Sequence, residues 1–92
     1  MSFEERKYAI ESIGSFHGWE FEGLHGQWHL RFEKAEKKKK IIVDVYYNKK
    51  ILNGGYPGTP LKIFIKRSYE RSENKYGIDL EKLEEIFKNY KP

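Results

Sequence analysis

The sequence predicts an α+β fold, in which a four-stranded antiparallel meander carries an N-terminal and a C-terminal helix on one face. Three observations predict it. Apolar residues recur at helical spacing near both ends of the chain, they alternate with polar residues in the middle, and turn-forming residues separate the alternating runs. Helices over one face of a sheet give a two-layer sandwich, so the expected order of elements is α-β-β-β-β-α.

The first helix is expected over residues 3–14. Ser2 and Glu5 have the spacing of a capping box, in which the side chain of each residue accepts a hydrogen bond from the backbone N–H of the other. Apolar side chains then recur near helical spacing until Gly14, where the helix is expected to end.

Two antiparallel hairpins are expected next. Trp19 and Phe21 alternate with acidic residues, the alternation resumes from Trp28 to Glu33, and a third strand covers residues 41–47. Turns centred between residues 24 and 25 and between residues 36 and 37 would bury one apolar face. The expected cross-strand pairs are Phe21 with Trp28, Trp19 with Leu30, Phe32 with Ile41, Leu30 with Val43 and Trp28 with Val45.

The last two elements are a fourth strand over residues 61–66 and a helix that begins after a polar run from Arg67 to Lys75. Asp79 is the expected N-cap of this helix, with Ile78 and Leu83 in the positions of a hydrophobic staple. One face of the helix is lined by Leu80, Leu83, Ile86, Phe87 and Tyr90.

Residues 48–60 are rich in glycine and proline, and they do not follow the alternating pattern. They form either a long loop, of the kind that is uncommon unless it is functional, or a continuation of the third strand that turns at Asn53 and Gly54.

The 92 residues are expected to form a single domain, residues 1–92. Apolar residues make up 38% of the chain, so the core is small, and two Trp, seven Tyr and six Phe are expected to fill it. Such a core predicts either modest stability or a homodimer. The absence of cysteine excludes a disulfide and a thiol nucleophile. No run is apolar enough to span a membrane and no signal peptide is recognised, so a cytoplasmic protein is expected.

The net charge of +4 is concentrated in the middle of the chain. Residues 34–75 hold twelve basic and four acidic residues, whereas residues 1–33 hold three basic and six acidic ones. Clustered cations bind polyanions because they neutralise phosphates and release counterions. The alternative is a lysine-rich sheet surface that serves only to keep the protein in solution.

Aromatic rings are interleaved with the cations of this basic region. Proteins that bind single-stranded nucleic acid use the same combination, because cations neutralise the backbone while rings stack on bases. Phe64 is expected to be exposed between Lys62 and Lys66, unless residues 48–60 or a second copy of the chain covers it. The candidate nucleic-acid-binding residues are Lys37, Lys38, Lys39, Lys40, Lys49, Lys50, Tyr56, Lys62, Phe64, Lys66 and Arg67.

His29 and Asp44 are the residues with the best placement for catalysis. The expected register sets them opposite each other, with Arg31 and Tyr46 two residues along on the same face, and such a group could cleave a phosphodiester by general acid–base catalysis. Such an arrangement is more often a surface ion pair than a catalytic site. No catalytic residue is therefore assigned, and a non-enzymatic protein is expected. Neither a metal nor a cofactor is expected. His25 and His29 have the spacing of a metal pair on a helix but are expected in a turn and a strand, and the glycines at 54, 55 and 58 are not part of a Gly-Lys-Ser/Thr motif.

Residues 27–34, 43–47 and 83–89 resemble segments of small uncharacterised proteins from phage and mobile-element genomes. The resemblance implies an accessory role and no particular activity.

From the basic and aromatic residues we expect a small module that binds DNA or RNA non-specifically through its basic central surface. The alternative is a phage-type inhibitor or adaptor that binds a host protein, for example an anti-defence protein directed against a host nuclease.

Overall fold

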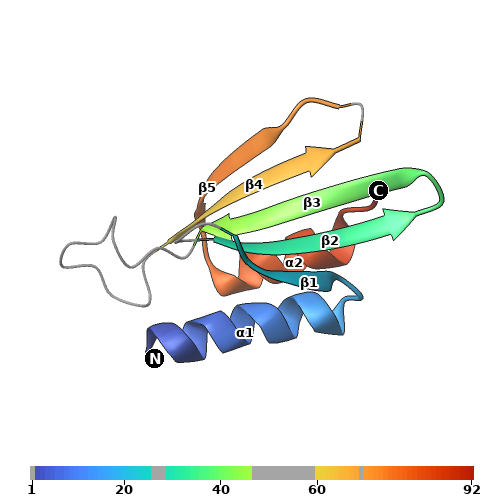
Figure 1. Ribbon diagram of the computed structural model, residues 1–92. Coiled ribbons are helices and arrows are strands. Elements are labelled where there is room, and N and C mark those ends of the chain that lie inside the picture. The colour runs from blue at the N-terminus through green and yellow to red at the C-terminus, as the bar shows by residue number, and fades with distance from the viewer. Residues whose placement is uncertain (1, 26–28, 47–59, 69) are drawn as a thin grey trace.

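The computed structural model describes residues 2–25, 29–46, 60–68 and 70–92. The elements of this part of the chain are α1 (Phe3–Phe16), β1 (Glu20–His25), β2 (His29–Glu36), β3 (Lys39–Tyr46), β4 (Leu61–Arg67), β5 (Glu73–Ile78) and α2 (Leu80–Asn89). The strands form one antiparallel sheet in the order β1-β2-β3-β4-β5, and both helices lie on one side of it (Figure 1). The predicted α+β class is confirmed.

The predicted number of four strands is wrong, because a fifth strand, β5, begins within the polar run before the last helix. This strand lies at the edge of the sheet and pairs with β4 alone among the described strands. Only Ile78 is buried among its residues, and the pairing shifts between Leu61 and Ile63 at a bulge. An edge strand with so few buried side chains lacks the apolar alternation by which the other strands are recognised.

Both helices begin at the predicted caps. The side chain of Ser2 accepts a hydrogen bond from the backbone N–H of Glu5 at 3.1 Å, and the capping box is complete. The carboxylate of Asp79 accepts from the backbone N–H of Lys82 at 2.8 Å. Ile78 and Leu83 are both buried, as the staple requires.

Helix α1 continues past Gly14 to Phe16, two residues beyond the predicted end. Gly18, with φ +81°, ends the helix instead. Its N–H donates to Ser15 O at 3.1 Å and the N–H of Trp19 donates to Gly14 O at 2.9 Å, which is a Schellman motif. Gly14 has a different role, because a Cβ atom there would lie 2.7 Å from the ring of Phe32.

The core lies between the helices and the inner face of the sheet. Its buried members are Ile10, Trp19, Leu30, Phe32, Ile41, Val43, Val45, Leu61, Ile63, Ile65, Ile78, Leu83, Ile86 and Phe87. Trp19, which directly precedes β1, contacts α2. Its indole N–H donates to Phe87 O at 2.7 Å, and the ring centroids of Trp19 and Phe87 are 5.3 Å apart.

The predicted register is wrong in both hairpins. In the second hairpin Phe32 faces Val43 and Leu30 faces Val45, a slip of two residues from the prediction. The turn lies at Lys37 and Lys38, one residue further along than predicted, because Lys37 adopts a left-handed conformation with φ 57°. A slip of two residues keeps every side chain on its predicted face.

In the first hairpin Phe21 faces Phe32 rather than Trp28, and Leu24 rather than Trp19 faces Leu30. The register shifts between Phe21 and Gly23, and Gly23 has φ +92°. Such a bulge adds a residue that the alternation of side chains does not reveal. Trp19 precedes the strand, and Trp28 lies outside the described residues.

Neither helix of the described part of the chain is long and apolar enough to cross a membrane.

Candidate nucleic-acid interface

The face of the sheet turned away from the helices has no described helix over it (Figure 1), and we call it the open face. Its side chains alternate along each strand with those of the core. The open face is made by Glu20 of β1, His29, Arg31, Glu33 and Ala35 of β2, Lys40, Ile42, Asp44 and Tyr46 of β3, Lys62, Phe64 and Lys66 of β4, and Asn74 and Tyr76 of β5.

An ion pair with a buried carboxylate lies at the centre of the open face. Arg31 and Asp44 are directly opposite in the register, and Arg31 Nε and Nη2 donate to the two carboxylate oxygens at 2.9 and 3.1 Å. The side chain of Asp44 is only 3% exposed, although no described helix covers this face. The hydrogen bonds to Asp44 raise the pKa of Arg31 above its ordinary value. The guanidinium of Arg31 is therefore charged at every pH at which a protein is normally handled.

This arrangement corrects the predicted pairing of His29 with Asp44. His29 faces Tyr46, and their ring centroids are 4.7 Å apart. His29 Nε2 is 3.9 Å from Asp44 Oδ1, which exceeds a hydrogen bond. All four residues of the predicted cluster share one face, but the carboxylate orients Arg31 and does not orient His29 as a general base.

Lys62 lies between two aromatic rings on the open face. Its Nζ is 5.2 Å from the ring centroid of Tyr46 and 5.6 Å from that of Tyr76. Both distances are within the range of a cation–π interaction. Tyr76 is 69% exposed, so one of the two rings presents most of its surface to solvent.

Phe64 lies beside this group, with Asp44 opposite it on β3 and Asn74 opposite it on β5. The ring is partly buried rather than exposed. Its two neighbours on the same face of β4 are Lys62 and Lys66, as predicted. Aromatic and cationic side chains thus alternate along β4 on the open face.

The predicted binding residues do not form one surface. Lys40, Lys62, Phe64 and Lys66 lie on the open face, whereas Lys37, Lys38 and Lys39 lie at the end of the β2–β3 hairpin. Lys40 forms a 3.0 Å ion pair with Glu33. Lys49, Lys50 and Tyr56 lie outside the described residues.

Arg67 is on the helix side of the sheet, opposite the buried Ile41. Its Nε donates to Lys91 O at 3.2 Å, and its guanidinium lies 4.8 Å from the ring centroid of Tyr90. Arg67 therefore does not share a face with Lys62 and Lys66.

Tyr76 is the residue of the open face that the sequence did not reveal. Its strand, β5, was not recognised, and without that strand the position of Tyr76 relative to Lys62 is undefined. The signal available was the short alternation of Asn74 and Tyr76, which flank Lys75.

In the described part of the chain, no three His, Asp or Glu side chains come together as metal ligands would. Comparison with models of protein families finds no family that matches, and comparison with curated proteins and with solved structures finds no match to this chain.

Proposed function

We propose that the protein binds single-stranded nucleic acid through the open face, with little sequence specificity. The observation that carries the proposal is the position of Lys62 between the rings of Tyr46 and Tyr76, on a sheet face that no described helix covers. Rings and cations at this spacing suit a strand whose bases stack while its phosphates are neutralised.

The charges of the open face also support the proposal. Two of its three carboxylates are held by a neighbouring cation, Asp44 by Arg31 and Glu33 by Lys40, and the third belongs to the exposed Glu20 of β1, opposite Glu33. Lys62 and Lys66 form no ion pair within the described residues, so their charges are available to a polyanion. These two lysines outnumber the single carboxylate of Glu20, so the face keeps a net positive charge.

An open sheet face favours a single strand over a duplex. Unpaired bases can be splayed against aromatic side chains, whereas bases within a duplex are stacked on each other and present only their edges. Each stacked base contributes about 1–3 kcal/mol, and the contact tolerates any base because every base has a π-face.

Fluorescence anisotropy with labelled single- and double-stranded DNA and RNA at 50 mM salt tests the proposal. We expect a single strand to bind more tightly than the duplex of the same length, and Lys62→Glu plus Lys66→Glu to weaken binding at least tenfold. The matched control is Lys82→Glu plus Lys88→Glu, which makes the same charge change on α2 in its first and last turns, where the effects on the helix dipole offset. Failure of the wild type to bind any of the four ligands would refute the proposal.

A protein-binding role is the second candidate, and a different surface supports it. Tyr8 is 72% exposed and Phe16 is 81% exposed on α1, on the side of the sheet opposite to the open face. Exposed aromatic side chains often supply the binding energy of protein interfaces. An inhibitor or adaptor of the phage type that uses α1 would lose its partner on Tyr8→Ala plus Phe16→Ala, while the open-face variants would leave that interaction intact.

A further inference from the structure

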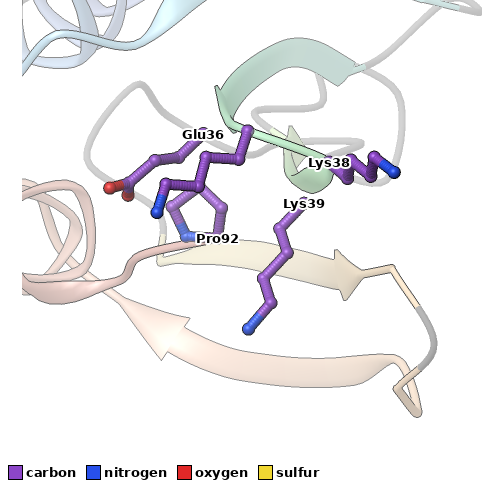
Figure 2. Close-up of a pocket in the computed structure, with 5 residues that line it drawn as sticks. Glu36, Lys38, Lys39 and Pro92 are labelled. Atoms are coloured by element: carbon purple, nitrogen blue, oxygen red, sulfur yellow. The ribbon is translucent and has the colours of Figure 1, made fainter.

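A basic groove lies at the end of the β2–β3 hairpin, beyond the open face. Figure 2 shows Glu36, Lys38 and Lys39 of the hairpin around Pro92 from the C-terminal segment. The hollow has a volume of about 570 Å³ and is lined by Glu36, Lys37, Lys38, Lys39 and Pro92. A second hollow of about 500 Å³ is lined by Lys38, Lys39, Lys40, Arg67, Ser68, Glu70 and Pro92. The two hollows share three residues, and we call them together the hairpin-end groove.

The groove carries an excess of positive charge. Five of its lining residues are basic and two are acidic. Lys38 and Lys39 form no ion pair within the described residues, whereas Arg67 Nη1 lies 3.7 Å from Glu70. The two lysine ammonium groups are free to move toward an anion, and the stems of the side chains and the Pro92 ring supply apolar walls.

The groove is continuous with the open face through Lys40 and Ser68. The Ser68 N–H donates to Lys40 O at 3.0 Å, and the Ser68 hydroxyl donates to the same oxygen at 3.2 Å. Lys40 belongs to the open face, where it faces Ala35 and forms its ion pair with Glu33, and it also lines the groove. Cations therefore follow one another from Lys62 and Lys66, past Lys40, to the hairpin end.

We propose that the hairpin-end groove binds phosphate groups of the strand that crosses the open face, so that the strand continues around the end of the sheet. The inference rests on the proposed function and assigns it a second contact region. Lysine acts as a mobile point charge on phosphate oxygens, which suits a backbone bound without regard to sequence. Ser68 directly follows β4 and is six residues from Lys62, so the path along the sheet is roughly 20 Å.

Binding of oligothymidines of three to twelve nucleotides tests the continuity of this path. We expect the affinity of the wild type to increase with length, and Lys38→Gln plus Lys39→Gln to weaken the twelve-nucleotide strand roughly tenfold while leaving the three-nucleotide strand within about twofold. Lys82→Gln plus Lys88→Gln is the matched control on α2 and should leave the length series unchanged. An unchanged length series in the Lys38/Lys39 variant would overturn the inference and leave the proposed function standing.

A titration with inorganic pyrophosphate, followed by backbone amide NMR, tests the groove without nucleic acid. We expect saturable shifts of the Lys38, Lys39 and Ser68 amide signals, and their loss in the Lys38→Gln plus Lys39→Gln variant. The native spectrum of that variant confirms that it is folded. Absence of saturable shifts in the wild type would overturn the assignment of a phosphate site. Shifts without binding of any oligonucleotide would refute the proposed function and, with it, the continuous path.

Discussion

Arg31 on β2 and Asp44 on β3 join the two central strands on the open face by two hydrogen bonds of 2.9 and 3.1 Å. The partners differ in exposure, since the side chain of Arg31 is 32% exposed and that of Asp44 is 3% exposed. Loss of one partner therefore does not have the same effect as loss of the other. Removal of Arg31 leaves a mostly buried carboxylate without its two charged hydrogen bonds, whereas the guanidinium can turn outward when Asp44 is removed.

We expect Arg31→Ala to lower the free energy of unfolding by about 2–4 kcal/mol, because it leaves a buried carboxylate without its strongest donor. Asp44→Ala should cost less, about 1–2 kcal/mol, because Arg31 reaches solvent. Urea unfolding of the two single variants and the double variant measures the difference. Equal losses in the two single variants would contradict the asymmetry.

The same pair predicts how stability depends on pH through Arg31. The pKa of Arg31 is raised in the folded protein, so its stabilisation is fully present below the unfolded-state pKa and is lost only as the pH rises through the higher folded-state pKa. That window lies in the strongly alkaline range. Between neutral pH and pH 9, the stability difference between wild type and Arg31→Ala should therefore stay constant. A steady fall in that difference across this range would show that Arg31 is not held as described.

Gly14 is a position where a favourable helix substitution should be harmful. Alanine normally stabilises a helix by about 1 kcal/mol relative to glycine. A Cβ at this position would approach two ring atoms of the fully buried Phe32 at 2.7 and 2.8 Å. We expect Gly14→Ala to lower the free energy of unfolding by about 1–3 kcal/mol, measured by thermal or urea unfolding.

Two variants check the cause of this loss. Ser15→Ala changes an exposed residue in the same turn and should alter stability by less than about 0.5 kcal/mol. Gly14→Ala in a Phe32→Leu background should cost less than in the wild type, because the smaller side chain leaves room. A strictly additive double variant would show that the ring of Phe32 is not responsible.

Lys37 has φ 57° in the turn of the β2–β3 hairpin, a conformation that favours glycine. The left-handed conformation costs a residue with a Cβ about 1–2 kcal/mol, so we expect Lys37→Gly to raise the free energy of unfolding by about 1 kcal/mol. This gain would raise the Tm by about 4–8 °C. Lys38→Gly is the control, because Lys38 does not have a positive φ. It should be neutral or destabilising, and an equal gain at both positions would contradict the turn geometry.

Tyr76 should contribute to binding and little to folding. It is 69% exposed on the edge strand, and its ring lies 5.6 Å from Lys62 Nζ. We expect Tyr76→Ala to weaken the binding of a single strand by about 1 kcal/mol or more, the loss of one stacked base, and to leave the Tm nearly unchanged. Tyr8→Ala removes an equally exposed tyrosine, 72% exposed, from α1 and should leave binding intact. Equal effects of the two variants would contradict the placement of the interface.

The parts of the fold that sequence periodicity revealed are those whose side chains divide cleanly between core and solvent. Strands β2, β3 and β4 each place alternate apolar residues in the core, with Asp44 of β3 the one residue buried on the other face, and both helix N-caps follow from Ser2 and Asp79. Periodicity assigns the face of a residue but not its neighbour, because a slip of two residues preserves every face. Which residues face each other across the two hairpins depends on the left-handed conformation of Lys37 and on the bulge near Gly23. The alternation of side chains indicates neither of these features.

The sequence predicted some residues of the candidate site but not their arrangement. Lys62, Phe64 and Lys66 were identified because they alternate with the core residues of β4. Arg67 was assigned to the same surface as Lys62 and Lys66 because all three belong to one basic stretch of the sequence. The presence of a basic stretch does not indicate on which side of the sheet each side chain lies. Tyr76 was missed because a polar edge strand does not need an apolar face.

The central claim is that Lys62 and Lys66 contact the phosphates of a bound single strand. The most direct test is the dependence of the dissociation constant on salt, measured from 50 to 200 mM for the wild type and for Lys62→Gln plus Lys66→Gln. Each phosphate contact on a single strand contributes about −0.7 to the slope of log K against log salt, so the variant should show a slope shallower by about 1.4. An unchanged slope, or no binding by the wild type at 50 mM salt, would contradict the claim.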